Sequence, residues 1–207
     1  MPRRTKIFFW SILAFAAVIR LANLTTPDIV GDEAHYAMRS LGYFDFIAST
    51  NTQTTPIIWF PEPVWWQGRS FHDAPPLVFF VEHIFMRIGG DSPIAVRLPA
   101  VLAGLLGVAG IFFLGRRLAG DRVGLVAAAI TAVLEAHVWI SRTGLLDGFL
   151  VPAITFSIYF FLKARERPVN YLWWGFTVGA GLLTKYLFLF MGPVFLIMLM
   201  TKDRSAW

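Results

Sequence analysis

Long apolar runs alternate with short polar stretches along most of this chain. A helix needs about 20 apolar residues to cross a bilayer, and fewer when its ends are buried in protein. Six runs come close enough to this length, so the pattern predicts an all-α integral membrane protein, a polytopic helical bundle of about six spans. The predicted spans cover residues 7–24, 94–114, 123–140, 149–162, 171–183 and 186–200.

A long region without a spanning run separates the first two predicted spans. Residues 25–76 contain six prolines and clustered Trp side chains. Loops of this length inside a compact protein usually carry function. Helix-forming side chains predict a short helix over residues 32–43. The apolar run 77–88 is short for a span and contains Glu82 and His83, so we expect a helix in the membrane interface.

Lys and Arg recur in every second gap between the apolar runs, as the positive-inside rule predicts for cytoplasmic loops. This orientation places the N-terminus in the cytoplasm and residues 25–92 outside, as a long first extracytoplasmic loop. The 141–148 turn and Lys185 then also lie outside. In the alternative, 77–88 is a full span and the next basic loop is outside. The basic loops are residues 116–122, 163–167 and 202–204.

The basic start of the chain is also typical of a signal peptide. No A-x-A-like cleavage site follows the first apolar run, so we expect an uncleaved first helix. The Arg3-Arg4 pair leaves a twin-arginine export signal as an alternative.

Composition supports the membrane class. Of the 207 residues, 57% are apolar and 15% are charged, whereas about a quarter of a soluble domain is charged. The net charge of +5 comes mostly from loops beside the spans and does not indicate a nucleic-acid partner. The absence of cysteine excludes disulfides and thiolate metal sites. No Walker-type loop, Rossmann fingerprint or zinc protease motif is present, which favours a donor that arrives on a lipid carrier.

Three acids on the predicted outer side are candidate catalytic residues. Asp32 and Glu33 follow the first span, and Asp147 lies in the 141–148 turn. A carboxylate can act as a general base that removes the proton of an acceptor hydroxyl. The plainer alternative is that Asp32 and Glu33 begin a surface helix, where the helix dipole favours acids. Asp32, His35 and Asp147 could also hold a divalent metal, but no spacing requires one.

Two cations on the same side are candidate phosphate ligands. Lys185 follows an apolar run, where an ammonium group is costly to bury. Arg142 offers a planar fork of donors that suits phosphate. In the plainer alternatives, Lys185 extends to the interface, and Arg142 pairs with Asp147 to close the turn. His72 and Asp73, before a proline pair, are further candidates for substrate binding.

Small residues predict close packing between spans. Gly104, Gly107 and Gly110 recur every three residues, so one face of this span should let a neighbouring helix approach closely. A Gly175-x-x-x-Gly179 motif predicts a second face of this kind.

Isolated charges inside the apolar runs need partners. Arg20, near the end of the first span, can reach the interface or pair with an acid. Glu135 and His137 can extend the outer site, pair with each other or pair with Arg20.

Five motifs, in their order along the chain, resemble those of a known family. They are GDEAHY at 31–36, DAPPL at 73–77, RLPA at 97–100, an Arg–Asp pair at 142 and 147, and GLLTK at 181–185. Their order and spacing resemble the N-terminal half of the polyprenyl-phosphate-sugar-dependent membrane glycosyltransferases. These form the protein O-mannosyltransferase-like family, which includes the lipid A aminoarabinose transferases.

The resemblance implies a GT-C fold and an enzyme of the cell envelope. By resemblance, Asp32 matches the essential acid of the first loop, Asp147 the acid of the second outer loop, and Lys185 the lysine that holds the carrier phosphate. Asp73 matches the acid before the proline pair. Several relatives have a lysine next to that acid, where this chain has Ala74.

The sequence therefore predicts one membrane glycosyltransferase domain over residues 1–207, with residues 25–76 as its extracytoplasmic catalytic loop. Because family members usually have more spans, we expect the domain to be incomplete. The expected reaction transfers a sugar, with inversion, from a polyprenyl-phosphate carrier to a lipid, polysaccharide or protein acceptor. The expected location is a bacterial or archaeal plasma membrane. A transporter of a polar lipid and a truncated, non-catalytic membrane scaffold are the alternatives.

Overall fold

The computed structural model describes residues 1–42 and 74–200, and all regular structure in these residues is helical. This confirms the all-α class. The helices are α1 (Arg3–Leu21), α2 (Gly31–Gly42), α4 (Leu77–Gly89), α5 (Pro93–Val133), α6 (Glu135–Ile140), α7 (Leu146–Ala164), α8 (Asn170–Thr184), the 3₁₀ segment η3 (Tyr186–Phe190) and α9 (Met191–Met200).

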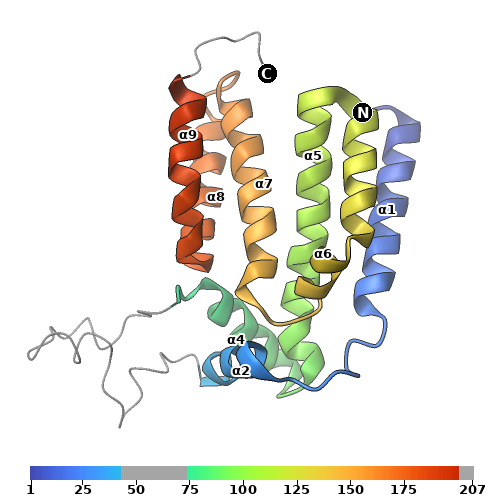
Figure 1. The fold of residues 1–207 in the computed structure, drawn as a ribbon, viewed down its shortest axis with the longest axis vertical. Coiled ribbons are helices and arrows are strands. Elements are labelled where there is room, and N and C mark those ends of the chain that lie inside the picture. The colour runs from blue at the N-terminus through green and yellow to red at the C-terminus, as the bar shows by residue number, and fades with distance from the viewer. Residues whose placement is uncertain (43–73, 201–207) are drawn as a thin grey trace, which may run out of the picture.

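The long helices stand side by side, and two shorter helices lie across one end of the bundle (Figure 1). α5 packs against α1 and α7, and α7 packs against α8. At the end of the bundle, α2 packs on α4, and α4 packs on α5. The helices predicted over 32–43 and 77–88 are thus present as α2 and α4, and they contact each other.

α5 consists of two helical arms joined by a sharp bend. Ala119 (φ −143°, ψ 17°) and Gly120 (φ 88°, ψ 175°) leave the helical region, and the positive φ of Gly120 favours glycine. The arms then run side by side (Figure 1). They approach so closely that a methyl group on Gly115 would lie 3.2 Å from the Cα of Gly124. The two arms correspond to the second and third predicted spans.

Two of the predicted spans are interrupted. The third is divided by Leu134 (φ −60°, ψ 117°), which separates the second arm of α5 from α6. The sixth begins as η3 and becomes α-helical only at Met191. Pro193 has no N–H to bond a carbonyl one turn earlier, so it fits the first turn of α9 but not the interior of a continuous helix. Neither of these two predicted spans is therefore a single continuous helix.

The glycines of the first arm of α5 lie under neighbouring side chains. A methyl group on Gly104 would overlap Oγ of Ser141, and one on Gly110 would overlap Oγ1 of Thr155. Gly107 is crowded in the same way. These contacts confirm the predicted close-packing face.

The two glycines of the predicted α8 motif, Gly175 and Gly179, face open space. A methyl group on Gly175 or Gly179 would have no described atom within 4 Å, apart from its chain neighbours and the nearby backbone of α8 itself. Large side chains of α8, such as Trp173 and Phe176, are also exposed. Within the described residues, the prediction of a second packing face on α8 is wrong.

Two described helices, α5 and α7, are long and apolar enough to cross a membrane, judged by length and composition. Many large apolar side chains point outward from the bundle. Examples are Trp10 and Val18 on α1, with exposed fractions of 65% each. The number of six spans stays a prediction.

Arg20 is fully buried inside the bundle. Its Nη1 donates to the carbonyls of Ala16 at 3.1 Å and Ala132 at 3.0 Å, and its Nη2 lies 2.7 Å from Nδ1 of His137. The prediction that Arg20 reaches the interface or pairs with an acid is therefore wrong, and the alternative pairing with His137 is confirmed. Ala132 precedes the break at Leu134, where helix carbonyls lose their usual donors, so Arg20 supports this break.

Candidate active site

A buried ion pair joins α2 to the start of α5. Nε and Nη2 of Arg97 each lie 2.7 Å from an oxygen of the Glu33 carboxylate. The exposed fractions of the two side chains are 2% and 6%. The backbone N–H of Gly144 donates to the same carboxylate at 2.9 Å. Because a buried charge is stable only with a partner and further hydrogen bonds, this arrangement fixes α2 against α5 and the turn before α7.

The other donors of Arg97 hold the segment that follows α1. Nη1 donates to the carbonyls of Leu24 and Pro27, both at 2.8 Å, and Nη2 donates to the carbonyl of Asp28 at 3.2 Å. Each of the five N–H groups of the guanidinium thus has an acceptor. Arg97 therefore sets the path of the chain from α1 into α2.

A second buried acid, Glu82 of α4, lies close to this pair. Its Oε2 accepts a hydrogen bond from Oγ of Ser40 at 2.7 Å, and its Oε1 has no partner among the described residues. Burial raises the pKa of Glu82 to about 8; the Ser40 hydrogen bond opposes this shift, and the charge of Glu33 adds to it. Glu82 therefore retains its proton at neutral pH, which avoids a second buried negative charge beside Glu33.

Asp32 lies next to the ion pair in sequence but faces a pocket. The pocket has a volume of about 320 Å³, and Asp32 belongs to its lining. The oxygens of Glu33 are occupied by Arg97 and Gly144, so Asp32 is the one of the two adjacent acids that can meet a substrate. Other lining residues come from the segment before α2, from the end of α6 and from the turn that follows it: Pro27, Asp28, Val30, Trp139, Thr143 and Leu145.

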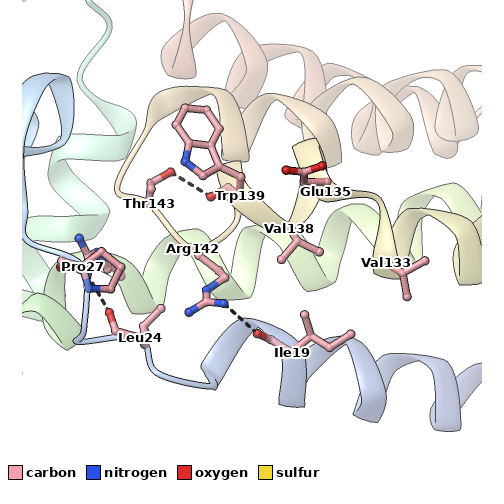
Figure 2. Close-up of a pocket in the computed structure, with 10 residues that line it drawn as sticks. Ile19, Leu24, Pro27, Val133, Glu135, Val138, Trp139, Arg142 and Thr143 are labelled. Atoms are coloured by element: carbon pink, nitrogen blue, oxygen red, sulfur yellow. Dashed lines mark hydrogen bonds between the residues drawn. The ribbon is translucent and has the colours of Figure 1, made fainter.

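A second, larger pocket adjoins the first between the end of α1 and α6 (Figure 2). Its volume is about 560 Å³, and it shares Pro27, Arg97, Trp139 and Thr143 with the Asp32 pocket. Most of its wall is apolar, and the guanidinium of Arg142 enters it from the loop after α6 (Figure 2). The space beside Asp32 therefore continues into a largely apolar groove.

The candidate residues Asp147 and Lys185 contact each other directly. Nζ of Lys185 lies 2.8 Å and 2.9 Å from the two carboxylate oxygens of Asp147. Asp147 is in the first turn of α7, and Lys185 is the C-cap residue that directly follows α8. Their side chains are 45% and 34% exposed, so the pair can be reached from outside.

Arg142 does not pair with Asp147, so the expected local ion pair is not formed. Its Nη2 donates to the carbonyls of Ala22 at 2.5 Å and Asn23 at 3.3 Å, and its Nη1 reaches the carbonyl of Ile19 at 3.4 Å (Figure 2). Arg142 thus bonds carbonyls in the last turn of α1 and just after it, a position where cations are favoured by the helix dipole.

A metal site is not preformed in the described part of the chain. In residues 1–42 and 74–200, no group of three His, Cys, Asp or Glu side chains could hold a metal ion. Asp32, His35 and Asp147 do not form such a group. His72 and Asp73, predicted to bind substrate, lie outside the described residues.

Arg97 and Glu82 have no assigned role in the sequence-based hypothesis, yet both are central to this region. A signal for each was available, because an ionisable side chain in an apolar run is costly and usually marks a buried partner or a functional site. Trp139, Thr143 and Leu145 were unforeseen as well. They carry no chemical signature and enter the site only because α6 and the following turn fold against α2.

The fold and the site define a helical membrane protein in which acids and cations from distant segments meet at one end of the bundle. The chain belongs to the dolichyl-phosphate-mannose-protein mannosyltransferase family, whose model matches residues 73–207. This family is a GT-C-like group of membrane glycosyltransferases, so the resemblance drawn from the motifs is confirmed.

One curated relative is the undecaprenyl phosphate-alpha-4-amino-4-deoxy-L-arabinose arabinosyl transferase of Edwardsiella ictaluri (strain 93-146). It is 26% identical to this chain over 147 residues, which cover 68% of this chain and 27% of the relative. The chain thus spans about a quarter of the length of this relative. No solved structure matches the chain.

Proposed function

We propose that this chain is the membrane part of a glycosyltransferase that moves a sugar from a polyprenyl-phosphate carrier to a hydroxyl group of an extracytoplasmic acceptor. Family membership supports sugar transfer, and the name of the bacterial relative specifies an undecaprenyl-phosphate-linked amino sugar. The observation that supports the proposal is that α2, which carries Asp32, lies at the same end of the bundle as the Asp147–Lys185 pair, where α7 begins and α8 ends (Figure 1).

The proposed topology has six spans: α1, the two arms of α5, α7, α8, and η3 with α9. The third of these spans combines the second arm of α5 with α6. Basic loops lie at the end of the bundle opposite α2 and α4 (Figure 1), which supports a cytoplasmic N-terminus and an extracytoplasmic site.

In the proposed reaction, Asp32 removes the proton of the acceptor hydroxyl. The acceptor oxygen forms a bond to the anomeric carbon while the bond from that carbon to the carrier phosphate breaks. The phosphate leaves with the electron pair, and the anomeric configuration inverts. The acidity of a phosphate makes it a good leaving group once its charge is held, so no covalent enzyme intermediate is required.

Lys185 is the proposed ligand of the carrier phosphate. Two of its three N–H groups are directed to the oxygens of Asp147, and the third remains for phosphate. Asp147, in the first turn of α7, thereby orients the ammonium group of Lys185. Arg142 is proposed to add a second positive charge near the groove beside Asp32.

Glu33 is proposed to position the site rather than to react. It fixes α2 through Arg97 and Gly144, and this places Asp32 at its pocket. Asp73 and His72 remain proposed substrate contacts. A divalent metal bound by Asp32, His35 or Asp147 when substrate arrives also remains a proposal.

A transfer assay in membranes tests this function. Membranes that contain this chain are supplied with radiolabelled polyprenyl-phosphate sugars, with and without a chelator, and acceptor labelling and anomeric configuration are measured. We expect labelling with inverted configuration. Loss of labelling with chelator would establish metal dependence. Movement of the intact lipid-linked sugar across the membrane without labelling would instead support the transporter alternative. The absence of both labelling and lipid movement would support the scaffold alternative.

A further inference from the structure

The end of the bundle opposite Asp32 carries a strong excess of positive charge. The N-terminus and the bend of α5 lie at this end (Figure 1). Residues 3–6, 116–122 and 163–167 each contain three Lys or Arg, and together they contain two acids, Asp121 and Glu166. Nine cations therefore face two acids in the described loops at this end.

A small pocket opens among these cations between α5 and α7. It has a volume of about 240 Å³ and is lined by Phe113, Arg116 and Arg117 of α5 and by Tyr159 of α7. One water molecule occupies roughly 30 Å³ in the liquid, so the pocket has room for a phosphate group. Its polar wall consists of two guanidinium groups and one phenol.

The guanidinium of Arg116 is held by Asp121 through its Nε atom. Its Nε donates to Oδ1 of Asp121 at 2.6 Å, and Oδ2 of Asp121 accepts a hydrogen bond from Oγ1 of Thr5 at 2.8 Å. The Thr5 hydrogen bond and the Arg116 pairing lower the pKa of Asp121. The two terminal nitrogens of Arg116 have no partner in the part of the chain that the structure describes. Asp121 therefore orients Arg116 without using the donors that best suit a phosphate.

Arg117 is arranged in a similar way. Its Nη2 lies 2.5 Å from Oε1 of Glu166, whose side chain is 56% exposed. Its other nitrogens have no partner among the described residues. On the α7 side, Nζ of Lys163 lies 5.2 Å from the centre of the Tyr159 ring, which adds a third cation beside the pocket.

We propose that this pocket binds the phosphate group of an anionic membrane lipid. Two oriented guanidinium groups and a nearby ammonium supply the charge, and Phe113 and Tyr159 supply an apolar wall for the carbons attached to the phosphate. Basic pockets between spanning helices on the cytoplasmic side are suited to anionic head groups. The site lies at the opposite end of the bundle from Asp32, so it does not depend on the proposed transfer reaction.

Binding of short-chain lipids to the protein in neutral detergent tests the proposal. The probes are short-chain phosphatidylglycerol, short-chain phosphatidylcholine and inorganic phosphate, and the readout is the dissociation constant from native mass spectrometry or thermal shift. We expect saturable binding of phosphatidylglycerol, at least tenfold tighter than phosphatidylcholine. The double variant Arg116→Gln/Arg117→Gln should weaken this binding about 25-fold, because each basic residue near an anionic lipid contributes about fivefold.

Arg4→Gln/Arg122→Gln is the matched control, because it removes the same two charges from exposed residues at the same end that do not line the pocket. It should change the dissociation constant less than threefold. Equal losses in the control and the double variant would overturn the proposal, since they would indicate general charge attraction. Full displacement of the lipid by an equal concentration of inorganic phosphate would overturn the lipid assignment in favour of a soluble phosphate ligand. An unchanged melting temperature in the double variant shows that lost binding is not lost folding.

Discussion

Arg97 and Glu33 are 64 residues apart in sequence, and they meet in a side-on ion pair with both N···O distances at 2.7 Å. Neighbouring residues on a helix point about 100° apart. Because Glu33 faces Arg97, its neighbour Asp32 is directed to the pocket. The pair therefore separates two adjacent acids into one that holds the fold and one that is available for chemistry.

Glu33→Gln should lower the free energy of unfolding by about 3–5 kcal/mol, because Arg97 would stay buried without a counter-charge. Denaturant unfolding in mixed micelles measures this change. Glu166→Gln is the control, since it breaks an exposed pair with Arg117 and should cost less than about 1 kcal/mol. Similar small losses in both variants would show that the buried pair does not hold α2.

Asp32→Asn should reduce sugar transfer about 10²–10⁴-fold, the usual contribution of a general base, with little change in unfolding. Asp28→Asn serves as the matched variant, because Asp28 lines the same pocket and the substitution removes the same charge. Its transfer rate should stay within a few-fold of the original. Retained activity in Asp32→Asn would exclude the proposed base.

Lys185→Met should reduce transfer about 10²–10³-fold, because the leaving phosphate would lose a positioned charge. Its pair with Asp147 is partly exposed, so the stability should change by less than about 1 kcal/mol. Lys6→Met, at the other end of the bundle, is the control and should transfer normally. An unaltered rate in Lys185→Met would place the phosphate elsewhere.

Glu82 should make stability fall as pH rises. Its folded pKa of about 8 is above the ordinary value of 4.5, so the unfolded chain loses this proton first. The free energy of unfolding should therefore decrease between pH 4.5 and pH 8, by on the order of 3 kcal/mol at pH 7, and level off above pH 8. Glu82→Gln should abolish this slope, and Glu135→Gln, an exposed acid of α6, should keep it. Melting temperatures across this pH range measure the effect.

Gly104→Ala should destabilise the protein by about 1–3 kcal/mol, because the added methyl group overlaps Ser141. Gly175→Ala adds the same group where no atom of another described segment lies within 4 Å, so it should be neutral or stabilise α8 by up to about 1 kcal/mol. Thermal unfolding distinguishes the two variants. A loss in Gly175→Ala as large as that in Gly104→Ala would indicate that α8 is packed at this face.

The apolar runs predicted the positions of most helices, because a helix that is buried or faces lipid needs apolar side chains along most of its length. The bend at Gly120 falls where a basic, glycine-containing loop separates two runs. The break at Leu134 has no such marker. It depends on Arg20, which bonds the carbonyl of Ala132 from another helix, and so it is a property of the assembled bundle.

The candidate site was also predictable only in part, because some of its contacts form only when the helices pack together. Topology placed Asp32, Asp147 and Lys185 on one side, and the structure brings Asp147 and Lys185 into contact. Sequence could not assign the partner of Arg97, since Asp32 and Glu33 are equally near in the chain. The choice between them depends on the rotation of α2, which packing against α4 and α5 decides.

The Glu33 carboxylate joins segments that are made at different times. Its donors are Arg97, 64 residues later, and the backbone of Gly144, 111 residues later. During synthesis from the N-terminus, α2 can dock in its final place only after the turn before α7 has left the ribosome. The Asp32 pocket is therefore assembled after both arms of α5 have been made, and no shorter nascent chain can present it.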